Sequence, residues 1–592
     1  MILQSLVRYY EILAEKGKVE QPGWCKAKVS FALELSEKGE LIGVLPLKDK
    51  DECGKKVAWG PKEIRVPQML TRSSGVAANF LCDNTSYFLG TDVKGKPERS
   101  LECFECAKEK HLEILKNTDS PAAEAVKAYF ETWNPGQASE NPVLQPHLDE
   151  MMAGANLVFL WKGRYVQEDS EVQNAWESYW QQDEQEAEGI CLVTGKRSSI
   201  ARIHSNIKGL QGAQSSGAAL VSFNAPAFES YGKEQSYNAP VGNYAVYAYT
   251  TALNYLLKDR KKMSYVGDTA VVYWAENGKE VYRSVFAAVS EPVSDNQELV
   301  HGVFHNLELG RAVDLEAVQD KLDPEQKFCI LGIAPNAARI AVRFFYTDSF
   351  GNILRHLKEH YDRMEIVRPA TDTLRYLGVW RMMQETVNRK SKDKKPAAGL
   401  TAQAYQSIIS GGRYPDGLYQ AVLGRIRADQ DNSDQRIYKI TRGKAAVVKA
   451  YLLRNTSYER EVLTVALNED CKIPAYVAGR VFAVLEEIQE KANPGINSTI
   501  KDRYFNSACA TPGVVFPILM KLKNSHIRKL ESKGMRIYFE QKLTELEGKL
   551  EIQEDGTIWP RRLSLEEQGA FILGYYHQTQ KRYEKKEKGE QE

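Results

Sequence analysis

The chain has 592 residues, of which 43% are hydrophobic, 10% aromatic and 27% charged, and its formal net charge is +1. This length predicts roughly two to four domains, each with a hydrophobic core of its own. No apolar run is long enough to span a bilayer, and no secretory signal pattern opens the sequence. Nine scattered cysteines favour reduced thiols in a cytoplasmic protein over a disulfide framework.

The first part of the chain is predicted to mix helices with short strands. The apolar spacing from Leu3 to Leu13 indicates an amphipathic helix that ends near Gly17. Two strand-forming runs follow, joined by a hairpin turn, and helical patterns come later. The expected strands are residues 29–35 and 41–47, and the expected helices are residues 120–132 and 172–188.

Strand signals continue through the middle of the chain. Asn243 is a suitable N-cap for a helix that runs to Leu257. Asn277-Gly278 predicts a turn between a strand and its partner, because this dipeptide accepts the positive φ angles of tight hairpins. The expected strands are residues 221–224, 271–274 and 284–289, and the hairpin of residues 328–334 and 340–346.

After about residue 350 helical periodicity dominates, residues 391–396 form a charged linker, and residues 582–592 form a disordered tail. The expected fold class is α+β: a mixed N-terminal region with short antiparallel strands, then an all-helical C-terminal region ending in a four-helix bundle. The expected parts are residues 1–110 (N-terminal α+β), 111–349 (central α+β with polar loops), 350–467 (basic helical region) and 468–592 (C-terminal bundle).

Charge is distributed unevenly along the chain. Residues 101–189 contain 6 Lys and Arg against 18 Asp and Glu, whereas residues 355–454 contain 20 against 10. A basic stretch attracts a phosphate backbone, and an acidic stretch can dock basic proteins. Solvated helix faces would give similar runs, so both interpretations remain open.

Residues 204–257 form a polar stretch that is poor in ions. These 54 residues carry only four charges and are rich in Asn, Gln, Ser, Gly and Tyr. Such side chains cost less to desolvate than ions and can donate and accept hydrogen bonds to a polar partner. A Gly-rich region that folds onto itself has the same composition. Ser215 and Ser216 do not match the nucleophile elbow, and no phosphate loop follows.

His356, Glu359 and His360 match the H-x-x-E-H pattern of inverted zincins, which makes a zinc peptidase the alternative from a different functional class. The pattern is short, lies among basic residues and lacks an evident third carboxylate ligand. Neither the His301 and His305 pair nor Cys103-x-x-Cys106 has the further ligands of a zinc site. We therefore expect no catalytic residue, no metal and no cofactor.

Several short strings of the sequence are more specific than its composition. They are Met1-Ile2-Leu3-Gln4-Ser5-Leu6, Pro22-Gly23-Trp24, Arg72-Ser73-Ser74-Gly75, Asn79-Phe80-Leu81-Cys82-Asp83-Asn84, Lys208-Gly209, Gln214-Ser215-Ser216-Gly217-Ala218, Val221-Ser222-Phe223-Asn224, Ser230-Tyr231-Gly232-Lys233-Glu234-Gln235-Ser236, Asn238-Ala239-Pro240 and Thr251-Ala252-Leu253-Asn254. These strings resemble one known family, the large subunit of the type I-C CRISPR Cascade complex, also called the Csd-one family and a Cas-eight-type subunit. The resemblance is strong over residues 1–90 and 190–275 and moderate over 328–346.

The resemblance implies a non-catalytic DNA-binding subunit of a cytoplasmic ribonucleoprotein. Such subunits inspect duplex DNA for the protospacer-adjacent motif, help to form the R-loop and help to recruit the helicase-nuclease. Implied partners are duplex DNA, the displaced strand, the 5′ handle of the guide RNA, and the backbone, handle-binding and small subunits. The resemblance further implies that the C-terminal bundle resembles a small subunit and is also made separately. A structural scaffold that never touches DNA remains an alternative.

Two sets of residues are the expected DNA contacts. Short polar side chains and a few cations suit base edges in a groove, and Lys and Arg on helices suit phosphates. The first set is Arg72, Ser73, Ser74, Asn79, Asn84, Lys208, Gln214, Ser215, Ser216, Lys233, Gln235 and Asn238. The second set is Arg425, Arg427, Arg436, Lys439, Arg442, Lys444 and Lys449.

Aromatic residues are interleaved with these cations and could stack on bases of a displaced strand. The same residues at helical spacing equally describe a core. They are Tyr376, Trp380, Tyr405, Tyr414, Tyr419 and Tyr438.

Overall fold

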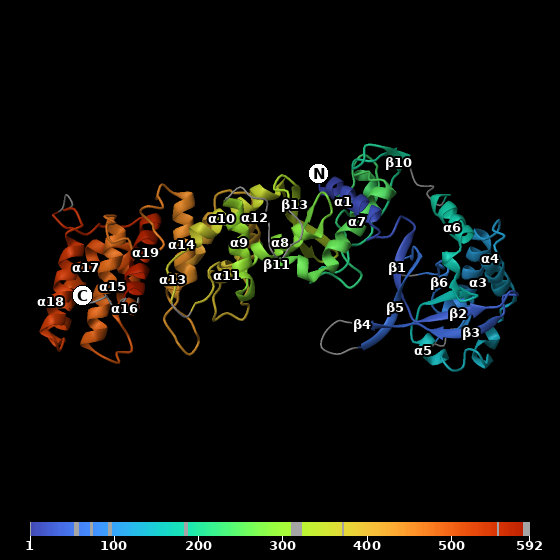
Figure 1. The fold of residues 1–592 in the computed structure, drawn as a ribbon, viewed down its shortest axis with the longest axis horizontal. Helices are drawn as coiled ribbons and strands as arrows, with labels where there is room; N and C mark the ends of the chain where they lie inside the picture. Colours follow the sequence, from blue (N-terminus) through green and yellow to red (C-terminus); the bar gives the residue numbers. More distant parts are fainter. Residues whose placement is uncertain are drawn as a thin grey trace. The chain divides into compact units, whose positions relative to one another are not determined.

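The computed structural model describes residues 2–51, 58–70, 75–92, 97–182, 188–308, 322–369, 372–552 and 556–583. The chain divides into two compact units (Figure 1). Unit 1 comprises Met1–Ser205 with Val221–Tyr255, and unit 2 comprises Asn206–Leu220 with Leu256–Glu592. Among the described helices, none is long and apolar enough to cross a membrane.

Unit 1 combines small sheets with helices around its own aromatic-rich core, which includes Trp24, Phe88 and Phe159. The strand β2 lies between β3, which is antiparallel to it, and β7, which is parallel. The strands are β1 Trp24–Val29, β2 Phe31–Leu35, β3 Leu41–Pro46, β4 Lys48–Asp51, β5 Ala58–Pro67, β6 Cys82–Asp83, β7 Leu157–Trp161, β8 Arg164–Tyr165, β9 Glu188–Ile190 and β10 Arg197–Ser199. The sheets run β1-β5-β4, β3-β2-β7-β6 with β8 beside β7, and β10-β9.

The helices α2 and α4 of unit 1 begin after residues whose side chains accept hydrogen bonds from free backbone N–H groups. Ser120 accepts a hydrogen bond from the Ala123 N–H, and Pro121 occupies the first turn, where no N–H is needed. The helices are α1 Ile2–Glu15, α2 Thr85–Phe88, α3 Pro97–Ile114, α4 Pro121–Thr132, α5 Leu148–Met152 and α6 Ser170–Gln182, and α7 Asn243–Lys258 crosses from unit 1 into unit 2.

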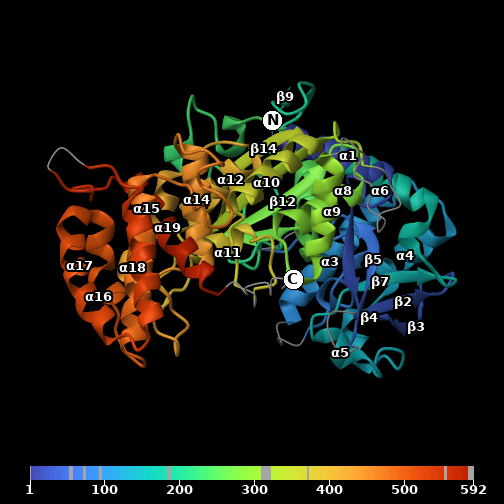
Figure 2. The same cartoon turned by 60° about the vertical axis from the view of Figure 1, so that its left-hand side comes forward.

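Unit 2 begins with an antiparallel sheet in the order β11-β12-β13-β14 and continues as helices (Figures 1 and 2). Every residue of β12 is buried, because helices and neighbouring strands cover it. The strands are β11 Ser264–Val266, β12 Thr269–Ala275, β13 Lys327–Asn336 and β14 Arg339–Ser349.

The helical part of unit 2 shares a single large core with its sheet. In the C-terminal part α15 packs along α19. The helices are α8 Glu280–Ser290, α9 Gln297–Glu308, α10 Phe350–Met364, α11 Val379–Gln384, α12 Ala398–Ile409, α13 Asp416–Ala428, α14 Arg442–Asn455, α15 Pro474–Ala492, α16 Ile500–Ala510, α17 Pro512–Lys529, α18 Lys533–Glu547 and α19 Leu565–Lys581.

The α+β class with an all-helical C-terminal region is confirmed, as are the first helix, the β2–β3 and β13–β14 hairpins and α7. The strand predicted at residues 284–289 is wrong. These residues lie in α8, where Tyr282, Val285, Phe286 and Val289 are buried at helical spacing.

Two further differences concern the polar stretch and the C-terminal bundle. Residues 221–224 form no strand, although Ala218 and Ala219 just before them make isolated bridges. The described part of residues 468–592 contains α16 in addition to the four expected helices. A Thr499 capping box begins α16. Residues 584–592 of the expected tail lie outside the described residues.

Candidate nucleic-acid interface

The loop of residues 206–219, here the first polar loop, is held in shape by its own backbone and by the sheet of unit 2. Ile207 and Ala218 exchange N–H···O bonds of 2.9 and 3.0 Å. Ala219 donates to the Ala338 carbonyl at 2.9 Å and accepts from the Ile340 N–H at 2.9 Å. The base of the loop is therefore fixed to the β13–β14 hairpin.

Polar candidate residues occupy the outer part of this loop. Lys208, Gln214, Ser215 and Ser216 are all exposed. Gly217 has φ +93°, and a Cβ there would come within 2.6 Å of the Ile207 carbonyl oxygen, so glycine permits the tight return of the chain. The loop thus presents short hydrogen-bonding side chains on a constrained backbone.

The second polar loop, residues 224–242, belongs to unit 1 and is organised by Asn238. The Asn238 Oδ1 accepts from the Ser230 N–H at 2.8 Å, and its Nδ2 donates to the carbonyls of Lys233 and Gln235 at 2.7 and 2.9 Å. Asn238 therefore shapes the loop. Lys233 is exposed, whereas Gln235 is half-buried with φ +46°.

Tyr231 was not among the DNA contacts expected from the sequence. It is 99% exposed at the tip of the Ser230–Lys233 turn, with φ +54°. A bulky residue at positive φ is uncommon, and an aromatic ring there gains no burial. The sequence could have indicated an exposed aromatic residue here, since Ser230-Tyr231-Gly232-Lys233 places Tyr231 beside the Gly of a turn.

The N-terminal candidates divide into two groups. Arg72, Ser73 and Ser74 lie outside the described residues. Asn79 is only 2% exposed, and its Oδ1 accepts from the Leu70 N–H at 2.8 Å. Asn84 caps α2 by accepting from the Ser86 N–H at 3.0 Å. Both asparagines use their polar groups to order neighbouring backbone.

Four of the seven basic candidates are buried. Lys449 is 2% exposed, donates to the Arg363 and Glu365 carbonyls at 3.3 and 2.9 Å, and has its pKa lowered to about 8 by burial. Arg442 pairs with Asp372 at 2.8 Å. Lys439 and Lys444 donate to backbone carbonyls, and Lys444 also pairs with Asp429. These four cations bond to internal carbonyl and carboxylate groups and do not face solvent.

The other three basic candidates lie nearer the surface. Arg425 is largely covered and pairs with Asp429 at 3.5 Å. Arg427 is exposed and donates to the Gln568 side chain at 2.7 Å, and Arg436 is exposed with no ion pair among the described residues.

Arg436 and the exposed Tyr438 line a cleft of about 250 Å³, here the basic cleft. Arg389, also exposed, lies on its lining, shortly before the charged segment 391–396 that was expected to be a linker. The high density of Lys and Arg in residues 389–395 could have identified this basic surface from the sequence. The lining residues are Gln384, Glu385, Val387, Arg389, Asp429, Arg436, Ile437, Tyr438, Thr441 and Lys444.

Most of the interleaved aromatics belong to the core. Trp380 and Tyr438 are 48% and 43% exposed, and only these two could stack on a ligand. The buried residues are Tyr376, Tyr405, Tyr414 and Tyr419.

The H-x-x-E-H residues are engaged in three separate contacts. His360 is fully buried and its Nδ1 lies 2.7 Å from the Tyr414 hydroxyl. Glu359 pairs with Arg363 at 2.9 Å, and the His356 Nδ1 lies 2.9 Å from the Ile409 carbonyl oxygen. Within the described ranges no group of three or more His, Cys, Asp or Glu side chains could hold a metal ion.

Comparison with known protein families identifies the class of this protein. Residues 6–583 match a family model described as a CRISPR-associated protein. That family is Cas_Csd1, and because the match spans nearly the whole chain, the chain belongs to it. The resemblance to the type I-C large subunit is thereby confirmed. A search of curated proteins returned no match.

Proposed function

We propose that the chain is the non-catalytic large subunit of a cytoplasmic type I-C Cascade that recognises the protospacer-adjacent motif in duplex DNA, assists R-loop formation and helps to recruit the helicase-nuclease. Membership of the Cas_Csd1 family supports this role. In such a complex the guide RNA reads the target by base pairing, so the protein needs to read only a short flanking motif. The proposed partners are target DNA, the guide RNA handle and the other Cascade subunits.

The observation that carries the proposal is the first polar loop. Its base is hydrogen-bonded to the β13–β14 hairpin, while Gln214, Ser215 and Ser216 remain accessible to solvent. Gln can bond an adenine edge bidentately, and Ser can donate to or accept from either base of a pair. A preorganised loop of this kind loses little conformational entropy on binding. We assign base contacts to it and phosphate contacts to Lys208.

Tyr231 supports a role in opening the duplex. An exposed aromatic ring can stack on an unpaired base, and such stacking contributes about 1–3 kcal/mol per base. The hydrogen bonds of Asn238 hold the turn that carries the ring, and Lys233 beside it can contact a phosphate. We propose that Tyr231 stacks on the base pair that is opened first.

The basic cleft supports retention of the displaced strand. Arg389 and Arg436 provide guanidinium groups for phosphates, and Tyr438 provides a stacking surface. Asp429 and Glu385 also line the cleft, but Lys444 and Thr441 engage them. The lining carries three cations, Arg389, Arg436 and Lys444, against these two carboxylates, so its net charge is positive.

To test motif reading, the complex is assembled with the Gln214→Ala variant. The control is Gln145→Ala, at an exposed position outside both polar loops. Affinity is measured for duplexes with and without the motif. Removing one base contact should reduce the discrimination by about 1–3 kcal/mol in Gln214→Ala only. Unchanged discrimination in Gln214→Ala, Ser215→Ala and Ser216→Ala would reject the loop as reader. Equal affinity of the wild-type complex for both duplexes would favour a pure scaffold.

The test of duplex opening uses Tyr231→Ala, Tyr231→Phe and the control Tyr583→Ala, which changes another exposed tyrosine. A fluorescent base analogue next to the motif reports unstacking in the assembled complex. Tyr231→Phe should retain opening because the ring remains, whereas Tyr231→Ala should slow it. Equal opening rates in all three variants would exclude a stacking role for Tyr231.

A further inference from the structure

A short basic turn follows α7 in unit 2 and contacts the first polar loop. The turn is the 3₁₀ helix η5, Arg260–Lys262. Together with Lys258 it places four cations against the single carboxylate of Asp259 within five residues. Lys258, Arg260 and Lys261 are exposed. None of these residues is among the DNA contacts expected from the sequence.

Neighbouring side chains fix the backbone of this turn. The Asp259 carboxylate accepts from the Lys261 N–H at 3.2 Å, and the Asp259 carbonyl accepts from the Lys262 N–H at 3.1 Å. The Lys262 ammonium pairs with Glu280 of α8 at 3.1 Å, and the Lys262 carbonyl accepts from the buried Arg283 side chain at 3.1 Å. Within the described ranges Lys261 forms no ion pair. The turn therefore keeps its shape and leaves the Lys261 ammonium accessible.

Arg260 connects the turn to the first polar loop. Its guanidinium donates to the Gly209 carbonyl oxygen at 2.6 Å and to the Tyr265 hydroxyl at 2.7 Å. That hydroxyl in turn accepts from the Gln211 N–H at 3.2 Å. Gly209 has φ +82°, so the chain turns there in a conformation that glycine adopts without strain. These bonds fix the segment that leads from the base of the loop toward Gln214.

The chemistry of arginine suits this connection. A guanidinium group presents several N–H donors in fixed directions and can hold two acceptors at once, whereas an ammonium group is a compact point charge. Both bonds form within the protein alone, so they order the loop before DNA binds and reduce the entropy lost on binding. Because Arg260 and Lys261 are consecutive, the same turn sets both the conformation of the loop and the position of the Lys261 side chain.

We propose that η5 is a phosphate-binding element of the first polar loop, a role that rests on the motif reading assigned to that loop under the proposed function. Lys261 contacts a phosphate of the duplex, and Arg260 is a positioning residue that holds the loop beside this contact through Gly209. Phosphate contacts fix the register of a protein on a duplex, while contacts to base edges supply the sequence preference. The turn and the loop together provide both kinds of contact.

The first test needs no DNA and follows hydrogen–deuterium exchange of the full-length protein by mass spectrometry. Arg260→Lys and Tyr265→Phe should each accelerate amide exchange in residues 208–212 about tenfold, because the bonds that order this segment depend on these two side chains. The control is Arg413→Lys, since the exposed Arg413 also donates to a carbonyl, that of Asn455, at 2.8 Å. Unchanged exchange in both Arg260→Lys and Tyr265→Phe would overturn the positioning role.

The second test measures the affinity of the assembled complex for duplexes with and without the motif. Arg260→Lys keeps the positive charge, so it should retain the salt dependence of binding but lose about tenfold in discrimination, because the loop must then be ordered on binding. Arg413→Lys should change neither quantity. Preserved discrimination in Arg260→Lys together with a loss in Gln214→Ala would overturn the role of Arg260 and leave the proposed function intact. A wild-type complex without discrimination would overturn both.

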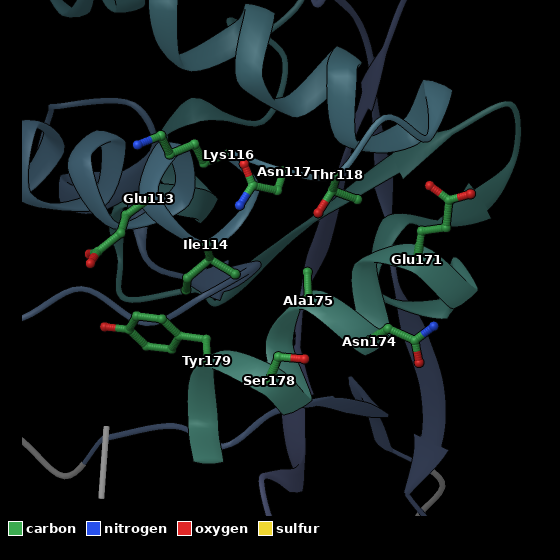
Figure 3. Close-up of a pocket in the computed structure, with 10 residues that line it drawn as sticks. All are labelled: Glu113, Ile114, Lys116, Asn117, Thr118, Glu171, Asn174, Ala175, Ser178 and Tyr179. Carbon is green, nitrogen blue, oxygen red and sulfur yellow. The ribbon is translucent and has the colours of Figure 1, made fainter. Parts of the chain in front are cut away.

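The third test compares Lys261→Gln with Lys116→Gln in the assembled complex. Lys116 is also exposed, but it lines a cleft of about 500 Å³ between α3 and α6 of unit 1, which Glu113 and Glu171 line as well (Figure 3). Lys261→Gln should reduce the slope of log affinity against log salt by about 0.9 for every duplex and leave motif preference unchanged. Lys116→Gln should leave the slope unchanged. An unaltered slope in Lys261→Gln, or an equal decrease in both variants, would overturn the phosphate contact.

Discussion

The hydroxyl of Tyr575 in α19 donates a 2.6 Å hydrogen bond to the carboxylate of Glu486 in α15. The Thr499 hydroxyl donates to the other carboxylate oxygen at 2.7 Å. Glu486 is 3% exposed, and burial raises the pKa of Tyr575, so the phenol stays protonated and remains a donor. This contact ties the last helix to the first helix of the C-terminal bundle.

Tyr575→Phe should therefore destabilise the protein by about 1–3 kcal/mol, because a buried carboxylate is deprived of a donor while the ring still packs. Urea unfolding followed by circular dichroism measures the change. Tyr583→Phe, at a 74% exposed position, should change the free energy of unfolding by less than about 0.5 kcal/mol. Equal stability of the two variants would show that the Glu486 contact contributes nothing.

A second prediction follows from the close approach of α15 and α19. A Cβ on Gly479 would overlap the Phe571 carbonyl, so Gly479→Ala should force the helices apart and destabilise by about 1–3 kcal/mol. Gly424 in α13 has open space around it, and Gly424→Ala should stabilise by about 0.5–1 kcal/mol. Opposite signs in thermal or urea unfolding are expected. A stabilising Gly479→Ala would mean that the helices can separate at no cost.

Because of His360, we expect the free energy of unfolding to decrease in acid. Burial lowers its pKa to about 3, whereas an unfolded histidine titrates near about 6.5. Above pH 6.5 both states are neutral, and as pH falls toward 3 only the unfolded state binds a proton. Proton binding by the unfolded state should therefore lower the free energy of unfolding at pH 4.5 by about 2–3 kcal/mol relative to pH 7.

His360→Gln removes this linkage. Urea midpoints of wild type and His360→Gln, measured at pH 7 and pH 4.5, should show a smaller decrease for the variant. Parallel decreases would show that His360 is protonated in the folded protein at pH 4.5.

The basic cleft should bind phosphates independently of sequence. Arg389→Glu with Arg436→Glu should weaken binding of the assembled complex to every duplex and reduce the salt slope by about 0.9 for each phosphate that is no longer neutralised. Lys28→Glu, at an exposed cation of β1, serves as the control. A change in motif preference with an unaltered salt slope would contradict the assignment.

The C-terminal bundle is expected to fold without the preceding parts, as its separate synthesis in the resembling family implies. A chain of residues 468–592 should be helical and unfold cooperatively. Gly569 of α19 lies against Val448 and Leu452 of α14, so a chain beginning at Arg442 should be more stable in urea. An unfolded 468–592 chain would reject autonomy. If mass spectrometry finds only the 592-residue product of the native gene, separate synthesis is rejected.

Local signals in the sequence determined many of the elements correctly. Asn243 and the apolar residues after it predicted α7, and the strand pattern on both sides of Pro335 predicted the β13–β14 hairpin, because both patterns depend on neighbours in the chain. The prediction of a strand at residues 284–289 was wrong because a short apolar run is compatible with both the helical and the strand periodicity. In the structure these residues form a helix, in which Phe286 and Val289 pack into the core.

The sequence alone also indicated the family, since the short strings around Gln214 and Tyr231 resemble it and the family model matches residues 6–583. Only the tertiary structure decided which cations face solvent. Lys449 and Arg389 are both basic residues of a helical region, yet Lys449 is buried against carbonyls of Arg363 and Glu365 and Arg389 is exposed. The carbonyls that accept from Lys449 lie more than eighty residues away in the chain, so no local pattern records them.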